Sequence, residues 1–319
     1  MLVALLFFAT CCVAFTNGAN ANFKGVASLY GSGTSSLRTA LWWGTATTFA
    51  GALTAVFIAQ GMLKTFSGKG LVPDALAHSP EFVLAVAIGA ALTSFLATRC
   101  GFPVSTTHAL VGALVGAGLM AGDHTIHLEA LGKNFFRPLF ISPVLAIVAG
   151  GLLYLVLKTA RLAPDHRTPT LDALHFLSGG AASFARGLND TPKMAALLLV
   201  AEGIGLRTGV ATVAVAMAVG GLLDARRVAE TLGKKVTAMN PGQGFAANLA
   251  TALLVTTANF NSLPVSTTHV SVGALLGIGI TTRQAKWKTV GQIILSWFIT
   301  LPCGAALAAL AWCGLRAVL

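Results

Sequence analysis

Long apolar stretches separated by short polar loops dominate the pattern of this chain. Residues 81–98, 138–157, 208–223 and 290–310 are runs of apolar positions with few charges. They approach or exceed the roughly 20 residues that a helix needs to cross the hydrocarbon of a bilayer. The pattern therefore predicts an all-α polytopic membrane protein, integral and multi-pass, in the plasma membrane or an inner membrane.

The pattern also repeats along the chain. The hexapeptide Pro-Val-Ser-Thr-Thr-His occurs at 103–108 and again at 264–269, and each copy precedes a helix of small residues. Residues 18–29 align in the same way with residues 187–198. These two pairs of motifs, in the same order, predict two related halves.

Each half has the same predicted order of elements. An interrupted element comes first, then a plain span, then a two-armed unit with the hexapeptide at its turn, then a last span. The two-armed unit returns to the side from which it starts, so each half crosses the membrane an odd number of times. The second half must then be inverted, which is the usual construction of secondary transporters. We predict a first transmembrane repeat at 1–157, a cytoplasmic linker at 158–171 and a second, inverted transmembrane repeat at 172–319.

Composition and charge agree with a membrane protein. Only 10% of the 319 residues are charged and the mean hydropathy is +0.79, whereas a soluble domain carries about 25% charged residues. The net charge of +11 is scattered over short loops, which argues against a nucleic-acid partner.

The distribution of basic residues predicts the orientation. Twelve of the 21 Lys and Arg residues fall on the side of the linker: Arg38, Arg99, Lys158, Arg161, Arg167, Arg226, Arg227, Lys234, Lys235, Arg283, Lys286 and Lys288. Six fall on the other side: Lys64, Lys69, Lys133, Arg137, Arg207 and Arg316. This excess predicts that the linker is cytoplasmic and that both termini are outside.

The three remaining cations lie within the interrupted elements, together with one acid. Charge at membrane depth is expensive and normally marks a substrate or ion path, which singles out Lys24, Arg186 and Lys193 with Asp190. The segment Asp190-Thr-Pro192 reads as the start of a half-helix with Asp190 as its N-cap. The positive end of such a helix would favour an anion. The alternative is that the lysines extend to the membrane interface.

The paired hexapeptides are the second chemical feature. Ser105 or Ser266 can cap the helix that follows, which leaves backbone N–H groups and hydroxyls free to donate to the oxygens of an anion. His108 and His269 could be metal ligands, but no Cys or carboxylate partner accompanies them. We therefore expect these histidines to support the site by hydrogen bonding, with no metal and no cofactor.

These duplicated motifs resemble the inorganic phosphate transporter (PiT) family. Residues 18–33 resemble its first signature, 184–198 its second, and 244–248 the segment before the second hydroxyl motif. The resemblance implies symport of inorganic phosphate with H⁺ or Na⁺ by alternating access. Together with the two lysines, it gives a candidate substrate site of Asn20, Lys24, Ser105, Thr106, Thr107, Asn189, Asp190, Lys193, Ser266, Thr267 and Thr268.

The chain departs from the family pattern at its carboxylates. Ala21 stands where an Asp usually follows the first motif Asn, and Asn248 stands where an acid is common. The candidate coupling-ion residues are Asn20, Asp190 and Asn248. Fewer carboxylates weaken a sodium site, and they leave open a sulfate or other oxyanion permease on the same scaffold.

Two functions of other classes are the rivals, an ion channel and an intramembrane hydrolase that uses His and Ser. An enzyme would need a base oriented by a third group, and no carboxylate is adjacent to His108 or His269 in the sequence. We therefore expect a transporter rather than an enzyme. Its partners would be an oxyanion and membrane lipid, and a homo-oligomer stays open.

Overall fold

The computed structural model describes residues 1–58, 60–68, 70–122, 126–163, 165–201 and 203–318, and their regular elements are helical. Lys69 of the predicted outer loops lies outside these residues. The first half contains α1 (Leu2–Ala21), α2 (Ala27–Gly31), α3 (Leu37–Ile58), α4 (Gln60–Phe66), α5 (Asp74–Ala77), α6 (Pro80–Arg99), α7 (Thr106–Ala121), α8 (Leu128–Leu131), the π-helical turn η1 (Gly132–Phe136) and α9 (Arg137–Thr159). The second half contains α10 (Pro169–Ala195), η2 (Ala196–Leu198), α11 (Leu206–Asp224), α12 (Arg226–Glu230), η3 (Thr231–Lys235), α13 (Pro241–Phe260), α14 (Thr267–Thr281) and α15 (Trp287–Val318).

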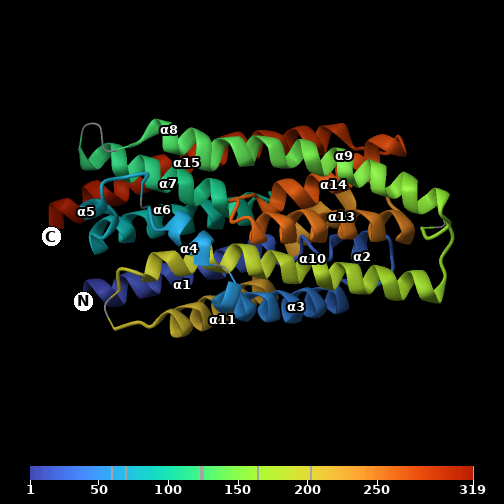
Figure 1. The fold of residues 1–319 in the computed structure, drawn as a ribbon, viewed down its shortest axis with the longest axis horizontal. Helices are drawn as coiled ribbons and strands as arrows, with labels where there is room; N and C mark the ends of the chain where they lie inside the picture. Colours follow the sequence, from blue (N-terminus) through green and yellow to red (C-terminus); the bar gives the residue numbers. More distant parts are fainter. Residues whose placement is uncertain (59, 69, 123–125, 164, 202, 319) are drawn as a thin grey trace.

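Six helical stretches of the described chain are long and apolar enough to cross a bilayer. They contain α1, α3, α6, α9, α11 and α15, and the long helices lie along one axis of the molecule (Figure 1). Many large apolar side chains on α9 and α15, such as Val144 and Phe298, are exposed on the outside of the bundle, as expected for a surface that faces lipid. The prediction of an all-α, multi-pass integral membrane protein is confirmed.

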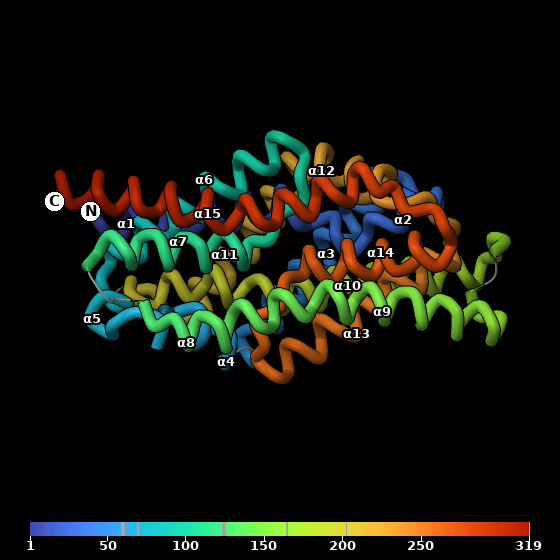
Figure 2. The backbone as a smooth tube through the Cα atoms, turned by 90° about the horizontal axis from the view of Figure 1, so that it is seen from above, coloured from blue at the N-terminus to red at the C-terminus, as the bar shows by residue number. Residues whose placement is uncertain are grey.

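Helices at corresponding places in the two halves run in opposite directions. In Figure 1, α9 starts at the end of the molecule where both termini lie and runs to the opposite end. Its counterpart α15 runs back and finishes beside the N-terminus, and the tube in Figure 2 follows the same course. This is the orientation that the predicted inversion of the second half requires.

The two-armed units are helical hairpins whose turns lie inside the protein. The pair α6 and α7 occupies the end that holds the termini, and the pair α13 and α14 occupies the opposite end (Figure 1). The turns meet, because the Thr268 hydroxyl donates to the Val104 carbonyl at 2.7 Å and the Thr107 hydroxyl reaches the Val265 carbonyl at 3.4 Å. Both hexapeptides therefore converge on one place.

The helices form two bundles, and each bundle takes elements from both halves of the chain. In the first bundle α1 packs along α6 and α11, while α7 packs along α6 and α15. In the second bundle α10 packs along α13 and α3, while α14 packs along α13 and α9. Exchanging the two halves converts one set of contacts into the other. The two hairpin turns, one from each bundle, meet where the bundles adjoin.

Small residues fix how α7 and α14 sit on the last helix of the other half. A side chain at Gly116 would collide with the backbone of Ala305, and one at Gly277 would collide with the backbone of Ile147. Such close approach is the usual role of glycine between membrane helices. It also sets the register, because Gly116 and Gly277 are equivalent and therefore Ile147 of α9 corresponds to Ala305 of α15.

One local prediction is wrong. Asp190 does not cap the start of a half-helix, because α10 continues through it to Ala195 and breaks only at η2. Asp190 instead pairs along the helix with Arg186 at 3.5 Å and Lys193 at 3.1 Å, spacings at which opposite charges favour a helix. The first half does break where the motif suggests, since α1 ends at Ala21 and Lys24 lies in the following turn.

Candidate functional site

Four charged side chains are buried where the two bundles meet. Lys24, Arg186, Asp190 and Lys193 keep between 1% and 3% of their surface exposed. Among the described residues, Asp190 is the acid that forms ion pairs here, with Arg186 and with Lys193. Three cations thus face one carboxylate, which leaves a formal excess of two positive charges in the interior. An excess of buried charge is costly unless a counter-charge is supplied.

The two lysines bridge the hairpin turns in the same way. Lys24 Nζ donates to the carbonyl oxygen of Val104 at 3.0 Å and to the hydroxyl of Thr268. In the other half, Lys193 Nζ donates to the carbonyl oxygen of Val265 at 2.9 Å and to the hydroxyl of Thr107 at 2.9 Å.

Each ammonium group therefore joins the turn of its own half to the hydroxyl motif of the other half. Both lysines are buried and bonded inside the protein, so neither of them extends to the membrane interface.

Asp190 and Arg186 extend this network across the bundles through Asn17. The Asn17 amide donates to Asp190 Oδ2 at 3.2 Å and to the Thr106 hydroxyl at 2.8 Å, and its oxygen accepts from Arg186. Thr267 also donates to Asp190 Oδ2, at 3.3 Å. The middle hydroxyl of each hexapeptide is thus part of one connected network around the carboxylate.

The two motif asparagines hold equivalent positions but different partners. Asn20 donates to the Thr98 hydroxyl at 3.0 Å and to the Phe102 carbonyl at 2.9 Å, and its oxygen accepts from the Val104 N–H at 2.9 Å. Its amide is thus committed to the turn after α6. Asn189 donates to Asn259 at the end of α13 and accepts from Lys193. Asn20 therefore holds a hairpin turn in place, while Asn189 touches the lysine directly.

The serines and histidines of the hexapeptides lie at the edge of this network. Ser105 and Ser266 cap α7 and α14, since each accepts from the backbone N–H of the following histidine at 3.2 Å. The rings of His108 and His269 are 4.7 Å apart, and His269 Nδ1 bonds the Leu139 carbonyl at 3.1 Å. No group of three potential metal ligands occurs among the described residues.

Asn248 lies away from Asn20 and Asp190, the other two candidate coupling-ion residues. It lies eleven positions before Asn259 on α13, about 16 Å along a helix, and its side chain faces Gly179 of α10. Its amide nitrogen has no hydrogen-bond partner among the described residues. Asn20, Asp190 and Asn248 therefore do not form one coordination shell.

Several residues of the network were missed at the level of sequence. They are Asn17, Thr98, Arg186 (noted as charged but left out of the site) and Asn259. The repeat held a usable signal, because Asn17 aligns with Arg186 and Thr98 aligns with Asn259. A polar residue at the same place in two otherwise apolar helices marks a shared interior position.

This arrangement suits an anion with several oxygens. The ammonium groups now donate to neutral carbonyl and hydroxyl oxygens, and a charged oxygen is a stronger acceptor for them. Thr107 and Thr268 add hydroxyl donors from opposite bundles, and the excess of two positive charges matches a dianion. No base oriented by a carboxylate accompanies either histidine among the described residues, so the hydrolase alternative has no support here.

We expect the hydroxyls of Thr107 and Thr268 to contribute about equally to anion binding. Thr107→Val keeps the shape but removes the donor, which should raise the half-saturation concentration about tenfold, since a hydrogen bond to a charged group is worth about 1.5–3 kcal/mol. Thr268→Val should do the same and Thr→Ser should restore affinity at both places. The half-saturation concentration for uptake measures this. If either valine variant keeps the wild-type value, the site is not shared between the two halves.

Buried charges at the junction of two helical bundles from oppositely directed halves are the arrangement expected of a membrane transporter. The model of the phosphate transporter family matches residues 17–173 and 163–308, so the chain belongs to that family. The expectation from the duplicated motifs is confirmed.

Two relatives match the chain over most of their own length. A Rhizobium meliloti protein named "Probable low-affinity inorganic phosphate transporter" is 33% identical over 259 residues, covering 77% of each chain. A Bacillus subtilis protein of the same name is 27% identical over 98% of this chain and 97% of its own. A solved structure titled "The sodium-dependent phosphate transporter" superposes on all of both chains with a TM-score of 0.87 at 20% identity, which shows a shared fold.

Proposed function

We propose that the protein carries inorganic phosphate across the membrane by alternating access, as a secondary transporter. The observation that carries the proposal is the buried excess of positive charge at Lys24, Lys193 and Arg186, next to the Asp190 carboxylate. Hydrogen phosphate brings two negative charges and four oxygens, which match the two ammonium groups and the Thr107 and Thr268 hydroxyls. The names of the relatives support the same substrate.

Phosphate fits the surroundings better than sulfate does. At neutral pH hydrogen phosphate keeps an O–H that needs an acceptor, whereas sulfate has none. Asp190 Oδ1 accepts from Lys193 alone among the described side chains, and the Val104 and Val265 carbonyls also point to this place. An acceptor facing an oxygen without a proton is repulsive, and such contacts discriminate strongly between similar ligands.

The two-bundle architecture supports a rocking movement around this site. Lys24, Lys193, Thr107 and Thr268 form hydrogen bonds that cross from one bundle to the other. If phosphate accepts hydrogen bonds from these donors, the direct bonds between the bundles are replaced by bonds from each bundle to the substrate. The bundles then separate on one side of the anion or on the other, which is how repeat-based transporters alternate.

The experiment that tests this function is uptake of radiolabelled phosphate into proteoliposomes. We expect uptake that saturates, that unlabelled phosphate suppresses, and that a large excess of sulfate leaves almost unchanged. Flux that rises without saturation would indicate a channel. Preferential uptake of sulfate would indicate the alternative function, a sulfate permease on the same scaffold.

We further propose that transport depends little on sodium. A sodium site needs several oxygen ligands, and a carboxylate normally supplies charge as well. Asp190 is already paired with Arg186 and Lys193, Ala21 has no carboxylate to offer, and Asn248 lies elsewhere on α13. An added Na⁺ would also meet the excess of positive charge in a low-dielectric interior. Protons or the substrate gradient alone would drive uptake.

Replacing sodium by choline at fixed pH and membrane potential should leave phosphate uptake nearly unchanged. Imposing a pH gradient under the same conditions separates proton coupling from uncoupled uptake. A drop of about tenfold on sodium removal, about 1.4 kcal/mol of coupling, would refute sodium independence without affecting the choice of substrate.

A further inference from the structure

Two pockets of equal size occupy equivalent places in the two halves. The outer pocket, lined by Lys133, Asn134, Arg137, Leu263, Val265 and other residues, has a volume of about 430 Å³. The neutral pocket, lined by Gln292, Leu295, Phe102, Val104 and others, also has a volume of about 430 Å³. In each, the last helix of one half passes the hairpin turn of the other.

The register of the helices makes the correspondence residue by residue. Because Ile147 corresponds to Ala305, Asn134 corresponds to Gln292 and Arg137 to Leu295, while Val265 and Val104 are equivalent in the hexapeptides. All six of these pocket residues belong to the lining of their pockets. The two pockets are therefore the same construction at opposite sides of the central site.

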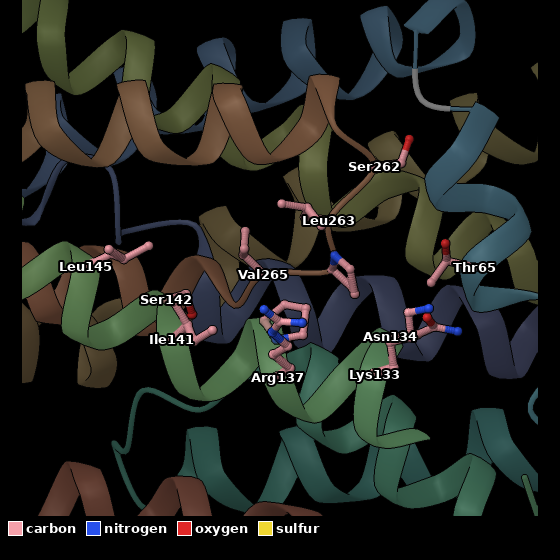
Figure 3. Close-up of a pocket in the computed structure, with 12 residues that line it drawn as sticks. Thr65, Lys133, Asn134, Arg137, Ile141, Ser142, Leu145, Ser262, Leu263 and Val265 are labelled. Atoms are coloured by element: carbon pink, nitrogen blue, oxygen red, sulfur yellow. The ribbon is translucent and has the colours of Figure 1, made fainter. Parts of the chain in front are cut away.

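Their charges differ. The outer pocket has Lys133 and Arg137, and the corresponding positions of the other half are Gly291 and Leu295. Neither cation of the outer pocket forms an ion pair with an acid of the described chain, and both side chains are exposed. Figure 3 shows them on the helix that faces the Leu263–Val265 turn, with Asn134 beside Thr65.

One residue of the outer pocket is bonded directly to the central site. Its lining includes Val265, whose carbonyl oxygen accepts from Lys193 Nζ of the central site at 2.9 Å. An anion in the pocket is thus separated from Lys193 by the turn that Lys193 itself holds. The π-helical turn η1, which carries Lys133 and Asn134, is of a kind found frequently at functional sites.

We propose that the outer pocket is an entry site that binds a phosphate-type oxyanion through Lys133 and Arg137 before it reaches the central site, and that the neutral pocket is the exit on the other side. The inference rests on the proposed function. Unpaired cations concentrate anions at a mouth and raise their rate of entry, whereas a neutral mouth on the far side does not retain the product. Transport at low phosphate would then be more effective from the side that holds the termini.

The test uses Lys133→Gln, Arg137→Leu and their combination, with Gln292→Ala in the neutral pocket and Arg207→Gln on the same side of the protein as controls. Uptake is measured in right-side-out and in inside-out vesicles, at low and at high salt. The double variant should raise the half-saturation concentration about tenfold or more in right-side-out vesicles at low salt, with an unchanged maximal rate. High salt should bring the wild type close to the variant, since exposed charges are screened.

Three results would overturn the proposal: an unchanged half-saturation concentration, an equal rise in both orientations, or an equal rise in the control variants. A lipid head group is the other source of the same chemistry, so the kinetics are repeated in phosphatidylcholine alone and with added phosphatidylglycerol. An effect that exists only with phosphatidylglycerol would assign the cations to lipid and also overturn it. Wild-type protein without saturable phosphate uptake would defeat the proposed function itself, which these outcomes do not.

Discussion

Asp190→Asn should abolish phosphate uptake while the protein still inserts into the membrane. The substitution keeps the size of the side chain but removes the negative charge that faces Arg186 at 3.5 Å and Lys193 at 3.1 Å. Removing one partner of a buried ion pair leaves an uncompensated buried charge, and because that charge adjoins the anion site we expect a loss of at least about 100-fold in uptake. The acceptor for the phosphate O–H is weakened by the same change.

A charge-balanced variant separates function from folding. Arg186→Gln combined with Asp190→Asn removes one charge of each sign, and it should restore thermal stability relative to Asp190→Asn without restoring uptake. Asp172→Asn, which breaks an exposed pair with Arg167 at 2.6 Å, is the matched control and should transport normally. Near-normal uptake by correctly inserted Asp190→Asn would remove Asp190 from the site.

Lys193→Met and Lys24→Met should each reduce uptake by a similar, large factor. Both lysines make the same pair of contacts, to a valine carbonyl of one turn and a threonine hydroxyl of the other. Methionine keeps an unbranched chain of similar length and removes the charge, so a loss of at least about 100-fold follows from the unpaired anion. Initial rates at several phosphate concentrations give the size of the loss.

Comparing Lys24→Met with Lys193→Met tests whether both halves of the protein hold the anion. Lys288→Met, at an exposed position of α15, should behave as the wild type and serves as the control for insertion. If Lys24→Met transports normally while Lys193→Met does not, the anion is held by one half of the protein and the two-sided site is wrong.

The repeated motifs carried most of what the sequence could predict. The hexapeptides predicted both hairpin turns and both serine caps, because a proline followed by hydroxyl residues before a helix has few other uses. They also predicted that the two halves would share one site. The buried positions of Lys24 and Lys193 followed from their places in long apolar elements, where charge is too costly to be accidental.

The parts that failed depend on contacts between distant segments. The helix start at Asp190 was inferred from local capping rules, and the pairs with Arg186 and Lys193 outweigh them. Asn248 was grouped with Asp190 by family pattern, but the helical rise along α13 separates it from Asn259 and hence from the network. The first bundle mixes α1, α6 and α7 with α11 and α15, and the second mixes α3 and α9 with α10, α13 and α14. This mixing has no local signature in the sequence.

The most direct test of the central claim is an experimental structure of the protein determined in the presence of phosphate. We expect one tetrahedral density between the two hairpin turns, within hydrogen-bonding distance of Lys24 Nζ, Lys193 Nζ and the hydroxyls of Thr107 and Thr268. The bonds from the lysines to the Val104 and Val265 carbonyls should lengthen or break at the same time. Phosphate bound elsewhere, with these lysine–carbonyl bonds intact, would contradict the account.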